Sequence, residues 1–349
     1  MVDALSASRV LAAAAERAMT YPYKVWGFGE DVCLRALVEL ARATGDEGPA
    51  AFVAGLVRPW CEAKAGQAAV TNADHVAPGM VILELFEGTR DDIYLQTALK
   101  LGDLHRGFPV VSGVRVHRPD LDGLSDLIWV DCIALDGPFL ARLANVTGEQ
   151  AWRDLAVETT LAYADALLDR GNRLFRHGFN TKERVQSDCC WARGNGWAMH
   201  GLLDTIVELP LEHPGRQDLI ALLEQQVQAV VRLQDASGHW HTVLDDPTSP
   251  LESSAAAFYA SAALKARRLG LLRSVGGLEA MVEAAVGAVL DVVLPERGGV
   301  ELGALPVSYA TPVGRRDTYV NAPTGFFPWG QGPLMLTLLE ATAAAQGRP

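Results

Sequence analysis

The 349-residue sequence has little positive charge. It contains 30 lysines and arginines against 42 aspartates and glutamates, a formal net charge of −12 at pH 7. Proteins that bind nucleic acid or anionic membranes non-specifically need a basic surface. The charge balance therefore argues against both kinds of partner. An anionic substrate would have to be held in a locally cationic pocket.

Cysteines are few, and long apolar runs are missing. The five cysteines are odd in number, irregularly spaced and without a CxxC pair, which does not indicate a disulfide framework. We interpret the adjacent Cys189 and Cys190 as small buried residues rather than as a reactive pair. The N-terminus lacks the basic head and uninterrupted apolar core of a signal peptide, and no segment is long enough to span a membrane. We therefore expect a cytoplasmic protein, while its oligomeric state does not follow from the sequence.

Common catalytic and cofactor motifs are also missing. The chain has no GxSxG motif, no Walker loop, no dinucleotide-binding glycine fingerprint and no HExxH motif. His239-Trp240-His241, before Asp245-Asp246, is the nearest approach to a metal site, but it has no third ligand in order. We expect neither a metal ion nor an organic cofactor.

What the chain does contain is a series of apolar segments at helical spacing, whereas strand-like alternation is scarce. The periodicity predicts twelve helices, or six helical hairpins, at about 3–19, 29–44, 48–64, 78–88, 91–105, 129–146, 149–168, 192–208, 216–234, 252–270, 277–293 and 330–346. The long connections hold aromatic, histidine, arginine and glycine residues, and they lie at 65–77, 106–128, 170–191, 233–251 and 294–328.

A weak internal repeat supports this pairing of helices. Thr44-Gly45-Asp46, Thr89-Arg90-Asp91 and Thr147-Gly148-Glu149 each end one apolar segment and precede the next. An open solenoid needs polar capping units at both ends, but the last predicted helix is as apolar as the middle ones. The sequence therefore predicts an all-α (α/α)6 barrel, a toroid of six inner and six outer helices that uses residues 1–349 as a single domain. Its long loops would gather at one mouth, where sites tend to be built.

Asp131 stands out in the apolar stretch from Leu127 to Gly148, two residues after Trp129. A buried acid without a partner costs several kcal/mol, and burial shifts a carboxyl pKa towards neutrality, where the group can both donate and accept a proton. Asp131 is therefore a candidate catalytic residue. The alternative is that it only caps a helix.

Two preceding loops hold further candidates. Asp74 would be a second carboxylate facing Asp131, or else an ordinary N-cap before Pro78. Arg115, His117 and Arg118 lie within four residues of one another. They would either cradle a carboxylate or form a solvated loop.

The densest cluster follows His177 and runs from Trp191 to Trp197, with the sequence Trp-Ala-Arg-Gly-Asn-Gly-Trp. Its glycines allow a ligand to approach the backbone, tryptophan faces suit a sugar ring, and Arg193 suits a carboxylate. The tryptophans could also be core residues. However, each glycine costs a helix about 1 kcal/mol relative to alanine, which favours a site. The aromatic segments 26–30 and 326–332 are candidates for further aromatic wall.

Taken together, these residues resemble the unsaturated rhamnogalacturonyl and glucuronyl hydrolases of glycoside hydrolase families 105 and 88, the former more closely. The resemblance covers most of the chain. It rests mainly on Trp129-Val-Asp131 with Pro138-Phe139, and on Ser187 with the 191–197 run. Supporting matches are Asp74-His75 with Pro78-Gly79, Ser237-Gly-His-Trp240, Glu252-Ser-Ser254 and Trp329-Gly-Gln-Gly332.

The resemblance implies an (α/α)6 barrel that hydrates the double bond of a terminal 4,5-unsaturated uronic acid, on small acidic oligosaccharides left by a polysaccharide lyase. It implies that Asp131 is the general acid/base and Asp74 the second important carboxylate, with no cofactor. The residues expected to bind substrate are His117, His177, Trp129, Trp191, Arg193 and Trp197. The loop before Asp131 departs from the family pattern. Phe108-Pro109 and residues 114–117 stand where the family usually has a His-Pro-Arg and Phe-Trp-His run, a difference that bears on leaving-group specificity.

Two other hypotheses stay open. One is an inverting glycosidase or sugar epimerase on the same toroid, with Asp74 and Asp131 as base and acid. The other is a non-catalytic carbohydrate-binding or scaffold toroid, which predicts Asp131 paired with a cation in a closed core. Convergence of Asp131, Asp74, Arg193 and Trp197 in one place would argue against the scaffold.

Overall fold

Six helices form an inner ring. The computed structural model describes residues 4–65 and 74–346, so residues 66–73 of the loop predicted over 65–77 lie outside it. Neighbouring inner helices pack against each other, and the last one contacts both its predecessor and the first, which closes the ring. The inner helices are α2 (Phe28–Thr44), α4 (Gly79–Thr89), α6 (Ile133–Thr147), α8 (Ala192–Glu208), α10 (Ser253–Arg268) and α13 (Pro328–Ala345).

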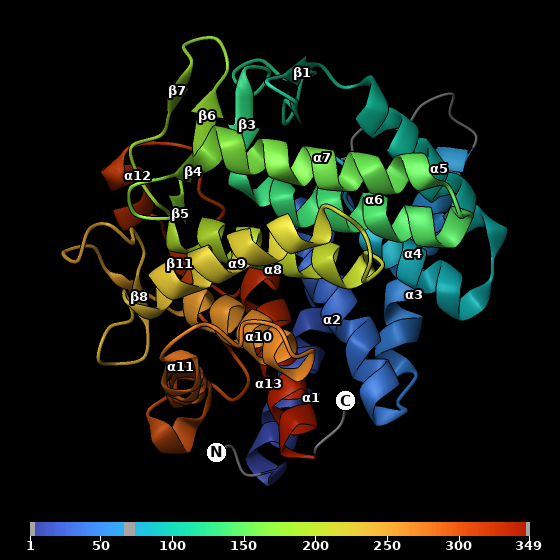
Figure 1. Cartoon of the computed structure of the whole chain (residues 1–349). Coiled ribbons are helices and arrows are strands. Elements are labelled where there is room, and N and C mark those ends of the chain that lie inside the picture. The colour runs from blue at the N-terminus through green and yellow to red at the C-terminus, as the bar shows by residue number, and fades with distance from the viewer. Residues whose placement is uncertain (1–3, 66–73, 347–349) are drawn as a thin grey trace.

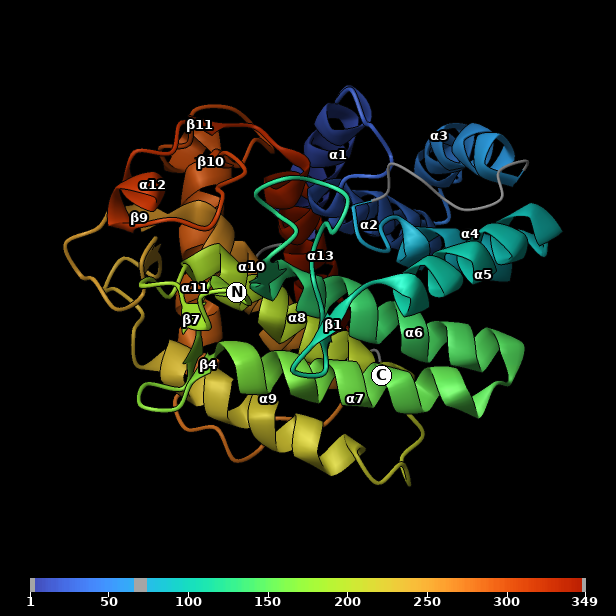
Figure 2. The same ribbon diagram turned by 90° about the horizontal axis from the view of Figure 1, so that it is seen from above.

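Six outer helices alternate with the inner ones along the chain. They are α1 (Ala4–Met19), α3 (Gly48–Ala65), α5 (Asp92–Gly107), α7 (Gln150–Leu167), α9 (Arg216–Val231) and α11 (Leu278–Val293). Each packs on one inner helix; α7, for example, lies outside α6, and α9 outside α8 (Figure 2). This arrangement confirms the predicted (α/α)6 toroid.

The inner helices are enclosed on nearly all sides, and their composition reflects this. Every residue from Ser254 to Leu264 of α10 is buried, and most of them are alanine or serine. Small side chains allow helices to pack closely on several faces at once. In the described part of the chain, no helix is both long and apolar enough to cross a membrane.

The three repeated triads have the same local structure. In each, the threonine hydroxyl donates to the carbonyl four residues earlier at 2.7–2.8 Å and accepts from the amide two residues later at 3.3 Å. The middle residue ends the helix in the left-handed conformation, with φ of 76° at Gly45, 58° at Arg90 and 77° at Gly148. The repeat is therefore a threonine-stabilised helix end, which turns an inner helix into the next outer helix.

The long loops carry all the described strands, each of two or three residues. The strands are β1 (Val110–Val111), β2 (Val114–Arg115), β3 (Leu127–Trp129), β4 (Leu168–Asp169), β5 (Leu174–Phe175), β6 (Gly178–Asn180), β7 (Val185–Gln186), β8 (Trp240–His241), β9 (Leu251–Glu252), β10 (Val307–Ser308) and β11 (Thr324–Gly325). The loop before α13 also holds the 3₁₀ turn η2 (Pro295–Arg297) and the short helix α12 (Arg316–Val320), which the periodicity did not predict.

These loops contact one another at one side of the helices, where most of the strands gather (Figure 1). β3 pairs with β6, which places the second long loop beside the third. Trp191 bridges to Val243, and the Arg316 guanidinium pairs with Asp246, which continues the contacts to the fourth and fifth loops. The prediction that the long loops meet at one mouth is confirmed for the second to the fifth loop.

The prediction that a helix begins at residue 129 is wrong. Residues Leu127–Trp129 form β3, Val130–Cys132 form the 3₁₀ turn η1, and α6 begins at Ile133. The cause is tertiary: the backbone of residues 127–129 pairs with β6, which is about fifty residues away in sequence. A local hydrophobic pattern does not encode that partner.

Candidate active site

Asp131 lies in η1, between β3 and α6, and is 1% exposed. Among residues 4–65 and 74–346, neither of its carboxyl oxygens has a hydrogen-bond partner. Nε2 of His177 is 3.5 Å from Asp131 Oδ2. The helix-cap interpretation of Asp131 is wrong, since the side chain makes no capping hydrogen bond to η1 or α6. A buried carboxyl without hydrogen bonds is costly, which makes this position a candidate site of function.

The orientation of His177 follows from its other ring nitrogen. Nδ1 is 2.8 Å from the hydroxyl of Tyr319 in α12. That hydroxyl oxygen already accepts a hydrogen bond from the Gly314 amide at 3.3 Å, and burial raises the pKa of Tyr319, so the phenol keeps its proton. A Tyr319 hydroxyl that donates to Nδ1 leaves the ring proton of His177 on Nε2, the nitrogen that faces Asp131. Sequence reasoning missed Tyr319, which belongs to no motif and falls in the predicted connection 294–328.

We expect Tyr319→Phe to remove the preference of His177 for the Nε2–H tautomer while leaving the barrel folded. The phenylalanine keeps the ring beside His177 and Trp191 but removes the donor to Nδ1, at a cost of about 1 kcal/mol in unfolding free energy. Imidazole ¹⁵N shifts should change from a single Nε2–H form to a mixture of tautomers. Tyr259→Phe, which removes another buried hydroxyl, is the control. Unchanged His177 shifts in Tyr319→Phe would contradict the assigned tautomer.

Asp74 pairs with His117 in a similar way. Nε2 of His117 is 3.2 Å from Asp74 Oδ1, and Nη1 of Arg118 is 4.0 Å away. Burial raises the pKa of Asp74, but the hydrogen bond and charge of His117, with the charge of Arg118, outweigh burial and lower that pKa below its usual value. An ionised carboxylate only accepts hydrogen bonds, so His117 carries a proton on Nε2.

The alternatives for this region are resolved by the same contacts. The cap interpretation of Asp74 is wrong, because α4 begins after Pro78 without a side-chain cap. The solvated-loop interpretation is also wrong, since Arg115, His117 and Arg118 are all buried. Nδ1 of His117 lies 3.2 Å from the Cys132 sulfur, next to Asp131.

Aromatic rings join the two carboxylate–histidine pairs into one cluster. Trp129 stacks on His117 at 4.5 Å between centroids and meets His177 edge-on at 5.7 Å. The ring of Trp191 lies 4.5 Å from that of His177. Phe28, at the start of α2, contacts both His117 and Trp197. The structure therefore brings the predicted site residues together, and Phe28 adds the inner helix α2 to their wall.

Arg193 lies behind Trp191 and is bound by protein groups. It donates to Glu252 at 3.0 Å, Ser308 at 2.8 Å and the Tyr309 carbonyl at 2.9 Å. Burial lowers the pKa of Arg193, while the charges of Glu252 and Asp131 act in the opposite direction. Arg193 thus ties the loop before α13 to the start of α8 and leaves only part of its guanidinium for a ligand carboxylate. Its role in substrate binding stays a prediction.

Several buried donors in this cluster are also without partners. The indole N–H groups of Trp129, Trp191 and Trp197 have no hydrogen-bond acceptor within the described residues, and neither does Nε2 of His177. Buried polar groups in folded proteins are normally hydrogen-bonded. Unpaired donors around an unpaired carboxyl are the arrangement expected of a site that binds a hydroxyl-rich ligand such as a sugar.

A second buried cluster lies behind Asp74. Asp136 Oδ1 is 2.6 Å from His75 Nδ1, while Oδ2 accepts from Tyr163 at 2.8 Å and lies 3.2 Å from His105. Burial raises the pKa of Asp136, but the charges and hydrogen bonds of the two histidines outweigh it and leave that pKa far below its usual range. His75 follows Asp74 directly and has a φ of 59°, so Asp136 holds the turn that presents Asp74. Sequence reasoning missed Asp136. It lies five residues after Asp131, and nothing else in the sequence distinguishes it.

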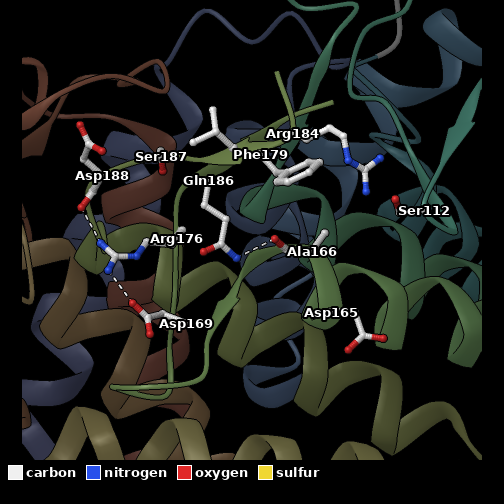
Figure 3. A pocket seen from close by; sticks show the side chains of 11 residues that line it. Ser112, Asp165, Ala166, Asp169, Arg176, Phe179, Arg184, Gln186, Ser187 and Asp188 are labelled. Atoms are coloured by element: carbon white, nitrogen blue, oxygen red, sulfur yellow. Dashed lines mark hydrogen bonds and ion pairs between the residues drawn. The ribbon is translucent and has the colours of Figure 1, made fainter. Parts of the chain in front are cut away.

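A large cavity lies elsewhere on the mouth. It measures about 700 Å³ and opens between the end of α7 and the β6–β7 hairpin (Figure 3). None of the predicted site residues lines it, and its carboxylates Asp169 and Asp165 are paired with Arg176 and Arg170. Its lining residues are Ser112, Asp165, Ala166, Asp169, Arg176, Phe179, Arg184, Val185, Gln186, Ser187 and Asp188. We therefore place the candidate active site at Asp131 and not in this cavity.

Three of the four residues considered as metal ligands have other partners, whereas Nδ1 of His239 has no hydrogen-bond partner in the described chain. Asp245 binds Arg176, Asp246 binds Arg316, and His241 Nδ1 lies 2.5 Å from the Ser249 carbonyl. Within residues 4–65 and 74–346, no three histidine, cysteine, aspartate or glutamate side chains are arranged to hold a metal ion.

Comparison with known proteins identifies the family of the chain. Residues 6–345 match the model of Glycosyl Hydrolase Family 88. The unsaturated rhamnogalacturonyl hydrolase YesR of Bacillus subtilis is 31% identical over 271 residues, which cover 76% of this chain and 75% of YesR.

Solved structures share the fold. A possible member of glycoside hydrolase family 105 from Salmonella enterica superposes with a TM-score of 0.83 at 24% identity, covering 97% of this chain and 94% of the other. The unsaturated glucuronyl hydrolase of Bacillus sp. GL1, described as responsible for glycosaminoglycan degradation, gives 0.75 at 17% identity, covering 97% and 96%.

Proposed function

This chain belongs to Glycosyl Hydrolase Family 88, and we propose that it removes a terminal 4,5-unsaturated uronic acid from lyase-generated oligosaccharides. It is a glycoside hydrolase. The name of its relative YesR supports a rhamnogalacturonan-type substrate. The observation that carries the proposal is the buried carboxyl of Asp131, which has no hydrogen-bond partner in the described chain and faces His177.

In the proposed reaction, protonated Asp131 donates its proton to C4 of the vinyl ether. The C4–C5 double bond supplies the electron pair for the new C–H bond, and positive charge develops at C5 and the ring oxygen. Water then adds to C5, and its proton returns to the Asp131 carboxylate. The net change is addition of one water. The product is a hemiketal, which opens to a ketone and releases the neighbouring sugar.

The two histidines have different tasks in this scheme. Nε2 of His177 lies 3.5 Å from Asp131 Oδ2, and a proton on this nitrogen would stabilise the carboxylate form that accepts the proton from water. His117 holds Asp74 ionised, so that Asp74 provides a fixed negative charge for the developing cation at C5. Trp129 lies between the histidines and keeps both rings in position.

Substrate recognition would use the unpaired donors. The buried and unpaired indole N–H groups of Trp129, Trp191 and Trp197 would donate to sugar hydroxyls and to the uronate carboxylate. Part of Arg193 adds positive charge close to Asp131. This local charge would offset the net charge of −12, which otherwise repels an anionic substrate.

The test is the ultraviolet absorbance of the conjugated double bond, which hydration removes. The protein would be incubated with lyase digests of rhamnogalacturonan, of glucuronan and of glycosaminoglycans. Saturated oligosaccharides of the same composition serve as controls. We expect absorbance to fall with the rhamnogalacturonan digest. Release of sugar from saturated controls would instead favour the inverting-glycosidase hypothesis, and no reaction with any digest would favour the binding-protein hypothesis.

We also propose a cytoplasmic location and a single catalytic domain formed by the whole chain. The support for the location is that the five cysteines are buried free thiols, which are typical of a reducing compartment. The support for the domain is the closed helical ring, whose last helix packs on its first. Cell fractionation with an antibody to the chain tests the location.

A further inference from the structure

Cys132 follows Asp131 directly and is fully buried. It occupies the N-cap position of α6, where a serine, threonine or aspartate side chain would normally bind the first helical amides. The Cys132 side chain makes no such hydrogen bond. Its sulfur lies 3.2 Å from Nδ1 of His117. The thiol therefore serves the pair that His117 forms with Asp74, and not its own helix.

The stack of Trp129 on His117 fixes the plane of the imidazole but not its orientation within that plane. The two rings are 4.5 Å apart and 9° from parallel. A half-turn about the Cβ–Cγ bond of His117 would keep the plane and exchange each ring nitrogen with a carbon. Asp74 Oδ1 would then face a carbon in place of Nε2, which lies 3.2 Å from it in the structure. Hydrogen bonds to the two nitrogens are what distinguish these orientations.

The partner of Nδ1 is chemically versatile. A thiol can both donate and accept a hydrogen bond, so Cys132 serves Nδ1 of His117 whether or not this nitrogen carries a proton. A carbonyl or a carboxylate in the same place would bind only the protonated nitrogen. The contact with Cys132 therefore holds the ring in either charge state.

The thiol also adds no charge to the site. Burial raises the pKa of Cys132 well above its usual value, and the nearby Asp136, Asp131 and Asp74 raise it further. Histidines are often oriented by a carboxylate or a backbone carbonyl on the second ring nitrogen. A carboxylate at position 132 would place another negative charge beside Asp131 and disfavour its ionised form. A neutral thiol avoids that repulsion.

The sulfur of Cys132 is itself held by the second buried cluster. The hydroxyl of Tyr163 hydrogen-bonds to it, and the same hydroxyl donates to Asp136 Oδ2 at 2.8 Å. Cys132, Tyr163 and Asp136 are all fully buried. The contact with His117 therefore starts from an anchored side chain.

We propose that Cys132 is a positioning residue of the reaction: its thiol holds Nδ1 of His117, so that Nε2 stays on Asp74 and keeps this carboxylate where positive charge develops at C5. The proposal rests on the proposed function. Cys132 acts through His117 and does not itself transfer a proton. Because it also adjoins Asp131 in the chain, this one residue links the supports of the two carboxylates.

Cys33 provides a matched control. It is also fully buried, on the inner helix α2, and its sulfur accepts a hydrogen bond from the Tyr23 hydroxyl at 3.2 Å. Cys33→Ala thus removes a buried, hydrogen-bonded sulfur whose partner is Tyr23 and not His117. Cys132→Ser is a second control, because its hydroxyl keeps a group that can donate and accept at the same position.

The first measurement is the ¹⁵N spectrum of the histidine side chains in the absence of substrate. In Cys132→Ala we expect the Nδ1 resonance of His117 to move, because this nitrogen loses its partner, whereas Cys33→Ala should leave it unchanged. Urea denaturation checks that both variants are folded. Cys132→Val, which fills the space with an apolar group, replaces Cys132→Ala if the latter does not fold. Unchanged His117 resonances in the folded variant would overturn the proposal.

The second measurement is turnover of a rhamnogalacturonan lyase digest, followed by loss of ultraviolet absorbance. We expect Cys132→Ala to lower kcat about tenfold with little change in KM, because Asp74 acts on charge that develops only in the transition state. Cys132→Ser should recover most of this loss, and Cys33→Ala should behave like the wild type. Equal losses of kcat in Cys132→Ser and Cys132→Ala, or a change in KM alone, would count against the positioning role. Failure of the wild-type protein to consume the digest would contradict the proposed function, on which the ¹⁵N result does not depend.

Discussion

Replacing Asp131 with asparagine is expected to lower turnover about a thousandfold, within the range for loss of a general acid/base. Asparagine has nearly the same shape but carries no proton that it can give to an alkene carbon. The same change should leave the unfolding free energy unchanged or raise it by about 1 kcal/mol, because it removes a buried carboxyl without hydrogen bonds. Turnover is measured by absorbance, and stability by urea denaturation.

The combination of these two results separates catalysis from structure. A structural aspartate would lose stability on substitution, whereas a catalytic one held in an unfavourable setting would not. Asp126→Asn is the matched control, since Asp126 lies five residues earlier and is exposed. It should retain both activity and stability. A stable Asp131→Asn protein with near-normal turnover would exclude Asp131 as the acid/base.

Asp136→Asn should have the largest effect on stability. It removes the charge that faces His75, His105 and Tyr163 in a fully buried cluster. Loss of one member of a buried charge network costs roughly 3–5 kcal/mol. We expect a decrease of this size in the unfolding free energy at pH 7, measured by urea denaturation. Activity should also fall, since His75 holds the turn that presents Asp74.

The effect should depend on pH with a defined sign. The folded pKa of Asp136 is lowered relative to that of an unfolded aspartate, so its stabilisation is present above the unfolded value of about 3.9 and is lost as pH falls towards the folded value. The stability difference between wild type and Asp136→Asn should therefore shrink below about pH 4. Tyr163→Phe, which removes one hydrogen bond to the carboxylate, should cost about 1–2 kcal/mol. A pH-independent difference would show that Asp136 acts through packing and not through its charge.

The sequence predicted the fold well because the relevant information is local. Helical periodicity located the twelve long helices to within a few residues, except at the start of α6, and the triads at Thr44, Thr89 and Thr147 mark where inner helices end. The apolar last helix predicted closure, which α13 achieves by packing on α2. Such signals depend on the periodicity of a segment and on the chemistry of its ends, which can be recognised without knowing the rest of the chain.

The sequence by itself also selected the residues of the candidate site, through the Trp129–Asp131 motif and the 191–197 run. Only the tertiary structure decided how they are arranged: β3 extends to Trp129 because β6 pairs with it, and Nδ1 of His177 meets the hydroxyl of Tyr319, which lies 142 residues away in the sequence. The same is true of the charge network at Asp136. Hydrogen bonds and charge interactions depend on distances of a few ångströms between remote segments, and only the closure of the ring determines those distances.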